Sequence, residues 1–455
     1  MFSVDDTIVA IATPPGSGGI GVVRLSGPSA REIACALTRR GDELEPRRAT
    51  FARFYPDRGT WLSSAADQVI VTSFPAPHSY TGEDVVEISG HGSPVLLRTI
   101  VSAAMARGAR LAEPGEFTLR AFLRERIDLV QAEAVRDLVA AVTPLQARAA
   151  FDQLEGTLTK DIATLDTQLF DLSVKLEASL DFPEEGYHFI ESGDAAREIA
   201  RIRQALDALL GTAARGRVLR EGLHVALVGR PNAGKSSLFN SLAGKGRAIV
   251  TDIPGTTRDL LVETVDVEGI PMTLVDTAGI RQGASDAVEV EGMARAVAAR
   301  DVAHVIMVVL DRSRPLDDDD RALLDGTRDR LRVVVANKSD LEPAWDALEL
   351  AHAPVVVASA VSGEGMDSVR AALSLAIAGE SRRDVPAVTN VRHIELLQQA
   401  RAALERAEAA AAAETPEEFV LSDLNEARRR FEEVTGARTS DDVLHAIFDR
   451  FCIGK

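Results

Sequence analysis

The sequence predicts a multidomain fold in which an α/β N-terminal domain precedes an all-α helical domain, and a second α/β domain is inserted into the helical one. Three patterns support this fold class. Short apolar segments separated by glycine and proline clusters fill the first part of the chain. Apolar residues recur every three or four positions on both sides of a central region. Within that region, continuous apolar runs alternate with helical stretches, as buried parallel strands and their connecting helices do.

The composition is that of a globular protein. A length of 455 residues suggests about three domains, and 46% hydrophobic with 26% charged residues argues against disorder. The net charge of −18 disfavours broad, non-specific nucleic-acid binding, which depends on Lys and Arg, although a local basic patch is compatible with it. Only Cys35 and Cys452 are present, which indicates a reducing compartment. Without a bilayer-spanning run or a targeting pattern, we expect a cytoplasmic protein with no membrane partner.

Residues 1–118 are predicted to form the α/β N-terminal domain. The glycine- and proline-rich run Pro14–Gly19 separates the first two of its expected strands. The short β-type segments are Ile8–Ala12, Ile20–Leu25, Gln68–Phe74 and Val85–Ser89.

Residues 119–216 and 380–455 are predicted to be two parts of one interrupted helical domain. The first part carries an apolar stripe from Leu154 to Leu176 that ends at Asp181-Phe-Pro, and a second stripe from Ile199 to Leu209. The second part contains the Ala-rich segment Leu396–Ala413 and then Phe431–Phe451. Both parts have amphipathic stripes that need partners, which favours their packing together; two independent helical units are the alternative.

Residues 217–379 are predicted to form the inserted domain. Its five apolar runs read as buried parallel strands of a doubly wound sheet. They are Val225–Val228, Thr273–Val275, Val305–Leu310, Val333–Ala336 and Val355–Ala358.

A phosphate-binding loop follows the first of these strands. The segment Gly229–Ser236 fits the pattern G-x-x-x-x-G-K-S and precedes a helical stretch, which is the context that the motif requires. Its glycines let backbone N–H groups approach phosphate oxygens. Lys235 is expected to reach the β- and γ-phosphates, and Ser236 to bind Mg²⁺.

Three further motifs identify the nucleotide. Asp276-Thr-Ala-Gly279 can hold the Mg²⁺ shell and sense the γ-phosphate. In Asn337-Lys-Ser-Asp340, Asp340 can accept from guanine N1 and the exocyclic amine, which adenine cannot match, and Asn337 can contact the base edge. Ser359-Ala360 resembles the loop whose backbone reads guanine O6. Four motifs in this order predict a Ras-like P-loop α/β domain that binds GTP.

Two departures from Ras-like proteins bear on hydrolysis. Ile280 follows Asp276–Gly279, where those proteins carry the glutamine that orients water. Asn232 lies in the P-loop, beside the first-switch segment Thr251–Asp259, in which Thr257 can complete Mg²⁺ coordination. Asn232 and the loop carbonyls are hard oxygen donors that suit a monovalent cation, in place of an arginine finger; the alternative is a loop-capping side chain. The GTP-binding candidates are Asn232, Ala233, Gly234, Lys235, Ser236, Ser237, Thr251, Asp252, Ile253, Pro254, Gly255, Thr256, Thr257, Asp276, Thr277, Ala278, Gly279, Asn337, Lys338, Asp340, Ser359 and Ala360.

The remaining segments resemble one family. The opening stretches Asp6–Gly16 and Gly19–Gly27, the stretches Pro114–Leu123 and Asp128–Ala134, and the closing Cys452-Ile-Gly-Lys455 are similar to those of the MnmE (TrmE) family of tRNA-uridine modification GTPases. With the inserted domain, the resemblance covers essentially the whole chain.

The resemblance implies a tRNA 5-carboxymethylaminomethyluridine modification GTPase that is stimulated by K⁺ and hydrolyses GTP to GDP and phosphate. It implies that residues 1–118 bind a reduced folate (5-formyl- or 5,10-methylene-tetrahydrofolate) and form a homodimer. It also implies a heterotetramer with an FAD-dependent protein of the MnmG (GidA) type, which adds an aminomethyl-type group to C5 of the wobble uridine of certain tRNAs. The family's K⁺ ligands match Asn232, Thr251, Ile253 and Thr256, besides Mg²⁺ at Ser236 and Thr257.

The resemblance also assigns a catalytic residue and a folate site. Glu289 matches the family's catalytic glutamate, and one extra residue around Gln282-Gly283 makes Glu291 the alternative. The folate residues match Arg24, Glu87, Arg126 and Lys455, with Arg126 standing where the family has lysine. Of the other polar candidates, His91 in Gly90-His-Gly92 is expected to be structural, and Cys452 to be an inert core thiol.

Two other function classes compete with this interpretation. A regulatory GTPase of the Era or Der type would carry a basic RNA-binding appendage, which the sequence does not show. A dimer scaffold with a degenerate GTPase is hard to reconcile with four intact nucleotide motifs. The modification state of tRNA wobble uridines distinguishes these classes.

Overall fold

The fold is described from a computed structural model over residues 5–40, 44–56, 65–181, 192–246, 261–276, 303–350, 355–378 and 388–454. The chain divides into two compact units. The first comprises Met1–Arg136, Leu154–Asp166 and Asn425–Lys455, and the second comprises Asp137–Gln153 and Thr167–Leu424. Each unit is described by itself.

The first unit contains a mixed six-stranded sheet, which we call the N-terminal sheet. Its order is β3-β4-β5-β2-β1-β6. All neighbours are antiparallel except β1 and β6, which are parallel. The strands are β1 (Ile8–Ile11), β2 (Gly18–Ser26), β3 (Thr50–Phe54), β4 (Asp67–Phe74), β5 (Val85–Gly92) and β6 (Arg110–Leu111). The four expected strands are present, whereas β3 and β6 were not predicted because they are too short or too polar to stand out.

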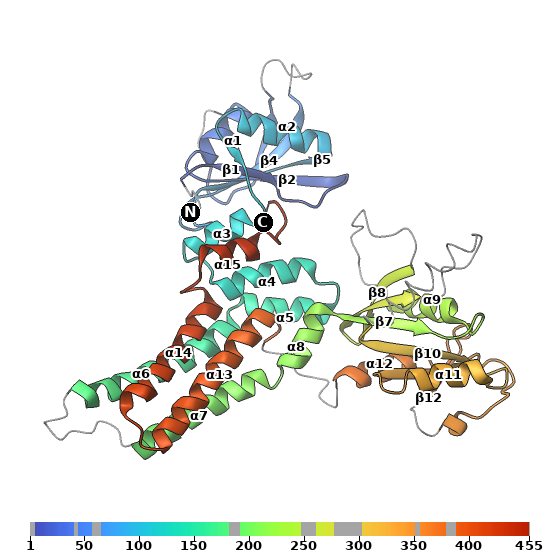
Figure 1. The fold of residues 1–455 in the computed structure, drawn as a ribbon. Coiled ribbons are helices and arrows are strands. Elements are labelled where there is room, and N and C mark those ends of the chain that lie inside the picture. Colours follow the sequence, from blue (N-terminus) through green and yellow to red (C-terminus); the bar gives the residue numbers. More distant parts are fainter. Residues whose placement is uncertain are drawn as a thin grey trace. The chain divides into compact units, whose positions relative to one another are not determined.

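Two helices cover one face of the N-terminal sheet. Helices α1 (Ala30–Thr38) and α2 (Pro94–Met105) pack on it (Figure 1). Side chains that alternate along the strands, such as Val69 and Val71 of β4, point into the core beneath these helices. Their neighbours on the strands, such as Ile70 and Glu87, therefore face the other side of the sheet.

The first unit continues into helices. These are α3 (Glu116–Leu123), α4 (Leu129–Ala140), α6 (Thr157–Asp181), α14 (Glu417–Thr435) and α15 (Asp441–Phe448), of which α4, α6 and α14 extend across the unit boundary. Leu119, Leu129, Phe448 and Phe451 share one core in the first unit. Beyond α15, Ile453 pairs with Pro114, and a Cβ on Gly454 would lie 2.3 Å from the carbonyl oxygen of Ile11. The residues preceding Lys455 therefore lie against the N-terminal sheet.

Two glycines divide helical stretches that the sequence suggests are continuous. Leu154 ends α5 (Pro144–Leu154) rather than opening the apolar stripe of α6, because Gly156 has a φ of +78° between them. Gly436, with a φ of +90°, separates α14 from α15 within the segment Phe431–Phe451. At that φ, L side chains are strained, and a Cβ on Gly436 would lie 2.7 Å from Leu129.

The second unit contains the inserted sheet, in the order β12-β11-β10-β7-β9-β8. Five strands are parallel, and only β8 is antiparallel, to β9. The strands are β7 (Leu223–Val228), β8 (Leu261–Val267), β9 (Ile270–Asp276), β10 (Val305–Asp311), β11 (Arg332–Asn337) and β12 (Val355–Val357). The five expected strands are present. The edge strand β8 was not predicted, because Glu263, Thr264 and Asp266 interrupt its apolar residues.

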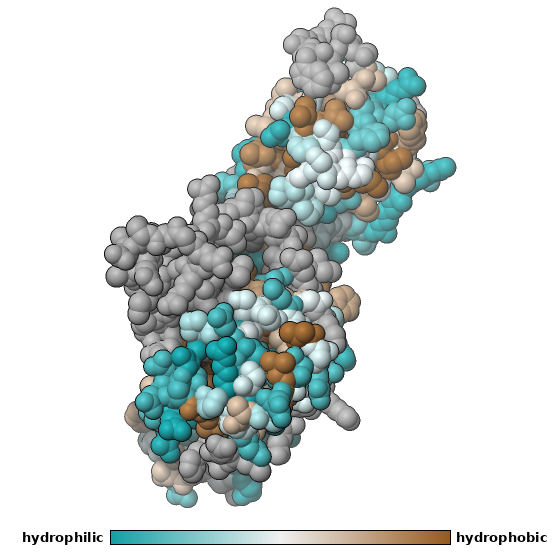
Figure 2. Space-filling view, turned by 90° about the vertical axis from the view of Figure 1, so that its right-hand side faces the viewer, coloured by the Kyte–Doolittle hydropathy of each residue, from teal (hydrophilic) through white to brown (hydrophobic). Residues whose placement is uncertain are grey.

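Helices cover both faces of the inserted sheet, as in a doubly wound fold. Helices α9 (Lys235–Gly246) and α12 (Met366–Ala378) pack on one face, and α11 (Asp318–Gly326) packs on the other, with the short 3₁₀ helix η2 (Ala347–Leu350) nearby. In Figure 2, hydrophilic side chains predominate on the described surface of this domain.

The second unit also holds helices from both sides of the insertion. Helices α7 (Ser192–Leu210) and α8 (Ala213–Glu221) precede the inserted sheet, and α13 (Val391–Ala412) follows it. Arg203 of α7 pairs with Glu408 of α13 at 2.7 Å, and Arg401 of α13 pairs with Asp207 of α7 at 2.5 Å, so α7 and α13 lie side by side (Figure 1). Among the described helices, none is both long and apolar enough to cross a membrane.

Candidate functional site

The P-loop connects the carboxyl end of β7 to α9. Lys235 is only 6% exposed, and its Nζ donates to the carbonyl oxygens of Gly229 and Arg230, both at 2.7 Å. Gly234 has a φ of +94°, and a Cβ there would lie 2.1 Å from Nδ2 of Asn337. Only glycine allows that approach. The loop is therefore closed around the lysine and tied closely to the strand that carries Asn337.

Asn337 links the P-loop to the two loops expected to read the base. It is 2% exposed at the end of β11. Its Nδ2 donates to the carbonyl oxygen of Ala233 at 2.9 Å, and its Oδ1 accepts from the backbone N–H of Ala360 at 3.1 Å. The sequence predicts that Asn337 contacts the base edge. The structure shows that its amide also connects three loops: the P-loop, the loop after β11 and the loop after β12.

Asp340 is exposed, and a hydrogen bond from a buried serine orients its carboxylate. Its Oδ1 accepts from the hydroxyl of Ser359 at 2.5 Å. Ser359 is fully buried, and its oxygen also accepts from the backbone N–H groups of Val361 and Ser362. A fixed, solvent-facing carboxylate next to a turn rich in N–H groups can discriminate guanine from adenine.

Asp311, which the sequence analysis missed, supports this region. Its Oδ2 lies 2.6 Å from Nζ of Lys338, and its Oδ1 accepts from the N–H and hydroxyl of Ser313. Burial raises the pKa of Asp311, but the hydrogen bonds from Lys338 and Ser313 outweigh it and lower that pKa below its usual value. The sequence pattern that could have identified Asp311 is an acidic residue directly after the apolar run of β10. It lies at the carboxyl ends of the parallel strands, where the P-loop also begins.

The predicted nucleotide residues gather at one edge of the inserted sheet, as far as they are described. Asn232, Ser236 and Ser237 are exposed on the P-loop and the first turn of α9, and Asp276 ends β9. The hydroxyl of Ser236 and the amide of Asn232 offer oxygen ligands that hard cations accept. In the described part of the chain, no group of three His, Cys, Asp or Glu could hold a metal. Thr251, Asp252, Ile253, Pro254, Gly255, Thr256, Thr257, Thr277, Ala278, Gly279, Ile280, Glu289, Glu291 and Lys455 lie outside the described residues.

Two of the folate candidates are in contact on the N-terminal sheet. Arg24 and Glu87 face each other across β2 and β5, and the carboxylate accepts from Nε at 3.0 Å and Nη2 at 2.8 Å. The guanidinium also lies 5.5 Å from the ring centroid of Tyr80 and 5.8 Å from that of Phe117. Burial raises the pKa of Tyr80, whose hydroxyl lies 2.9 Å from that of Thr118. A charged pair beside two rings suits a planar, polar heterocycle.

A third folate candidate, Arg126, lies against the loop between β4 and β5, which carries Tyr80. The side chain of Arg126 is exposed, and its Cγ is 3.2 Å from where a Cβ on Gly82 would stand. Gly82 lies two residues after Tyr80 in the loop between β4 and β5. The arrangement thus places Arg24, Glu87 and Arg126 around one loop. Cys452 is exposed, which corrects its expected place in the core: it follows Phe451, which takes the core position instead.

A buried ion network holds that loop to α3. Arg120 is 1% exposed and pairs with Glu83 at 3.2 Å, Glu116 at 2.9 Å and Asp6 at 2.5 Å. Burial raises the pKa of Glu116, but hydrogen bonds led by that of Arg110 lower it overall. Local sequence does not indicate the network, because Asp6, Glu83 and Arg120 lie far apart along the chain.

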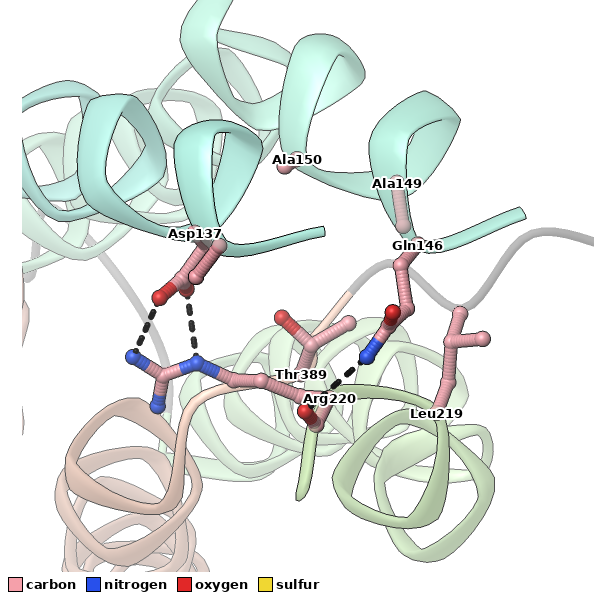
Figure 3. A pocket seen from close by; sticks show the side chains of 8 residues that line it. Asp137, Gln146, Ala149, Ala150, Leu219, Arg220 and Thr389 are labelled. Atoms are coloured by element: carbon pink, nitrogen blue, oxygen red, sulfur yellow. Dashed lines mark hydrogen bonds and ion pairs between the residues drawn. The ribbon is translucent and has the colours of Figure 1, made fainter. Parts of the chain in front are cut away.

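The inserted domain is attached at a junction that we call the stem, formed by Asp137, Gln146, Arg220 and Thr389. Arg220 of α8 donates to both carboxylate oxygens of Asp137, at 2.6 and 3.0 Å (Figure 3). Gln146 of α5 donates to the backbone carbonyl of Arg220, and Gln153 donates to the hydroxyl of Thr389. The stem residues line a cavity of about 60 Å³, which is room for a few water molecules.

We expect Arg220→Met to destabilise the second unit by about 1–3 kcal/mol, because it removes the two hydrogen bonds that Arg220 donates to the largely buried carboxylate of Asp137. The two side chains are only 17% and 13% exposed. The measurement is the urea midpoint of the full chain. Arg217→Met is the matched control, since Arg217 forms an exposed pair on the same helix. Adding Asp137→Leu should recover part of the loss; a double variant less stable than Arg220→Met would contradict this account.

Comparison with known proteins gives full-length matches. Residues 7–126 match the family model of the GTP-binding protein TrmE N-terminus, and residues 129–452 match that of the MnmE helical domain. The chain is 46% identical over 460 residues to the tRNA modification GTPase MnmE of Koribacter versatilis, with 100% of both chains covered. It is 44% identical over 459 residues to the same-named protein of Nitrosomonas europaea, with 99% of both covered.

A solved structure similar to the chain is the G domain of the Thermotoga maritima FeoB iron transporter, at 28% identity and a TM-score of 0.27, covering 34% of this chain and 98% of that one. The family matches, together with the two sheets and the helices, confirm the predicted fold class of an α/β N-terminal domain, an all-α domain and an inserted P-loop α/β domain.

Proposed function

The chain belongs to the MnmE family of tRNA modification GTPases, and from this premise we propose how it acts. It is a GTP hydrolase that acts in tRNA modification. The proposal adds that K⁺ stimulates hydrolysis to GDP and phosphate. It further adds that the protein works with an FAD-dependent partner of the MnmG type. Together they attach a carboxymethylaminomethyl-type group to C5 of the wobble uridine of certain tRNAs, with a one-carbon unit from a reduced folate.

One observation carries the GTPase part of the proposal. Asn337 is hydrogen-bonded to Ala233 of the P-loop and to Ala360 of the loop after β12. The P-loop and the loops proposed to read the base are therefore held together by one side chain. In it, Asp340 would accept from N1 and the exocyclic amine of guanine. The ammonium of Lys235, now held by loop carbonyls, would turn to the β- and γ-phosphates of GTP.

The P-loop oxygens support sites for two ions. Ser236 and Thr257 would hold Mg²⁺, and Asn232, Thr251, Ile253 and Thr256 would hold K⁺. Asn232 has a φ of +63°, a left-handed conformation that Asn tolerates, and its side chain is exposed on the P-loop. When bound, such ions supply positive charge next to the phosphates.

The N-terminal sheet supports a reduced-folate site. Glu87 would accept from the N–H groups of the pterin, while Arg24, Arg126 and Lys455 would attract the acidic tail. The ion pair of Arg24 with Glu87 and the nearby rings of Tyr80 and Phe117 suit such a ligand. We also propose a homodimer through residues 1–118, the division of the chain into 1–118, 119–216, 217–379 and 380–455, and a cytoplasmic location.

The experiment that tests the modification part is mass spectrometry of tRNA nucleosides after deletion of the gene. We expect the carboxymethylaminomethyl-type group to disappear from wobble uridines and to return when the gene is restored. Unchanged wobble uridines, together with a defect in ribosome assembly, would instead indicate a regulatory GTPase of the Era or Der type.

We expect GTP hydrolysis to be faster in KCl than in NaCl at equal ionic strength, because Asn232 and the Thr251–Thr256 segment offer oxygen ligands where no arginine finger is evident. Asn232→Ala should reduce the difference between the two salts. The measurement is the steady-state rate of phosphate release. Asn240→Ala, at an exposed residue of α9, is the matched control. Equal rates in both salts would refute the potassium site.

A further inference from the structure

Lys338, in the loop after β11, has a backbone conformation that is rare for lysine. Its φ is +68°, in the left-handed region that glycine adopts without strain and that a long side chain seldom adopts. The backbone N–H of Leu341 donates to the carbonyl of Lys338 at 3.0 Å, and that of Ser339 donates to the carbonyl of Ala358 at 3.1 Å. Lys338 is therefore the residue at which the chain turns from β11 into the segment that carries Asp340.

The ammonium group of Lys338 is held by Asp311, the last residue of β10. Its Nζ lies 2.6 Å from Oδ2 of Asp311, and the two side chains are 26% and 15% exposed respectively. Arg314 is a second cation near the same oxygen, but its side chain is 76% exposed and its Nε is 3.9 Å away. Lys338 is therefore the main partner of this oxygen, because a short and partly buried contact is screened less by solvent and salt.

The carboxylate of Asp311 is itself held in place by its neighbours. Its Oδ1 accepts from the backbone N–H of Ser313 at 2.9 Å and from the hydroxyl of the same residue at 2.6 Å. The backbone carbonyl of Asp311 accepts from the indole N–H of Trp345 at 3.1 Å, and Trp345 is buried. Asp311 also pairs with Asn337 in the register of β10 and β11. Its Oδ2 therefore has a defined position relative to Lys338, which follows Asn337.

The side chain of Lys338 is thus held at both ends. The backbone turn fixes one end, and the carboxylate of Asp311 fixes the other, so the methylene stem is ordered without a nucleotide. A lysine stem offers an apolar surface on which a planar ring can pack. Asp340, two residues further on, offers acceptors for the edge of a guanine ring. A side chain that is already ordered does not have to lose its rotamer freedom when the ligand binds.

A role in stability alone explains less of this arrangement. The positive φ at position 338 favours glycine, so the turn itself does not require a lysine. An asparagine at position 311 could also accept from Ser313, so the end of β10 does not require a carboxylate. Partly exposed ion pairs contribute little to stability. Strained backbone of the kind seen at Lys338 is concentrated at functional sites, which favours a role for the pair in binding.

We propose that Asp311 is the positioning residue of Lys338 in the guanine site and that it slows the release of bound nucleotide. This inference rests on the proposed function, because it requires guanine to bind beside Lys338 and Asp340. The ion pair keeps the stem of Lys338 against the plane of the base. When the pair is broken, the stem regains its rotamers and the nucleotide leaves faster. Asp311 acts through Lys338 and touches neither the base nor the phosphates.

A first experiment measures nucleotide release from the full chain. GDP that carries a methylanthraniloyl fluorophore on its ribose is bound with Mg²⁺ and displaced by excess GDP. We expect Asp311→Asn to release it roughly three- to tenfold faster, which corresponds to ordering one long side chain at binding. Asp318→Asn, the same change at an exposed residue of α11, should release it at the wild-type rate. Release from Asp311→Asn at the wild-type rate would overturn the proposal.

A second experiment tests whether Asp311 acts through Lys338. Lys338→Met removes the charge but keeps an unbranched stem, and it alters a partly exposed side chain, so it tests the pair even if Asp311→Asn disturbs the fold. We expect Lys338→Met to accelerate release about as much as Asp311→Asn does, and the double variant to release no faster than either. Effects that multiply in the double variant would show that Asp311 acts by another route.

The chemical step separates positioning from catalysis. The single-turnover rate of hydrolysis at saturating GTP should be unchanged in Asp311→Asn, and a slower rate would contradict a role confined to the base. Two further outcomes distinguish this inference from the function on which it rests. If the wild-type chain does not bind the labelled GDP, the proposed guanine site fails. If it binds and Asp311→Asn releases the label no faster, only the role of Asp311 fails.

Discussion

Glu289→Ala is expected to slow GTP hydrolysis by roughly a hundredfold or more, while leaving GTP affinity nearly unchanged. Ile280 stands where Ras-like proteins carry the glutamine that orients water, so another polar group must do so. Phosphoryl transfer depends mainly on positioning and charge stabilisation, so a misplaced water is costly. The P-loop and Asn337–Asp340, which would hold the nucleotide, are not altered by this change.

The measurement is single-turnover hydrolysis at saturating GTP and K⁺. Glu291→Ala is the control, because the extra residue around Gln282-Gly283 makes it the alternative match. A native rate for Glu289→Ala with a slow Glu291→Ala would move the assignment by two residues. Native rates for both variants would remove the carboxylate from the mechanism altogether.

Asp340→Asn is expected to weaken GTP binding by about 3–6 kcal/mol, or roughly 10²- to 10⁴-fold, because two hydrogen bonds to a charged acceptor are lost. The amide keeps one acceptor but presents an N–H₂ group to a donor of guanine. Xanthine carries an acceptor at the position of that exocyclic amine. The variant should therefore bind xanthosine triphosphate better than the wild type does.

Calorimetry with both nucleotides tests this expectation. Glu342→Gln removes an exposed carboxylate two residues further along the chain and should change neither affinity. If Asp340→Asn binds GTP as the wild type does, the carboxylate does not read the base. Ser359→Ala should have a smaller effect in the same direction, since its hydroxyl orients Asp340 and does not replace it.

Sequence patterns predicted the parts of the molecule that depend on local order. The buried strands of the inserted sheet are continuous apolar runs, and their connection to the P-loop is a motif of fixed spacing. Edge strand β8 escaped prediction because Glu263, Thr264 and Asp266 break its apolar run. The breaks at Gly156 and Gly436 also escaped, because an apolar stripe does not report a single residue with positive φ.

The candidate sites likewise contain residues that were predicted from the sequence and residues that were not. Arg24 and Glu87 were predicted by resemblance to motifs, and they meet across two strands. Asp311 and Lys338 are 27 residues apart, and nothing in their local sequence indicates an ion pair between them. The network around Arg120 joins residues more than one hundred positions apart, such as Asp6. Pairings of this kind depend on strand register and on the packing of helices, which cannot be predicted from the local pattern of one sequence.

The packing of the segment around Ile453 and Gly454 against Pro114 and Ile11 has a consequence for biosynthesis. These contacts join residues more than three hundred positions apart, so they form only after the chain up to Gly454 has left the ribosome. Because the entropic cost of closing a loop grows only with the logarithm of its length, the delay is kinetic more than energetic. The inserted domain, whose strands all precede residue 358, can fold while synthesis continues, whereas the N-terminal sheet gains these contacts only after Gly454 has been made.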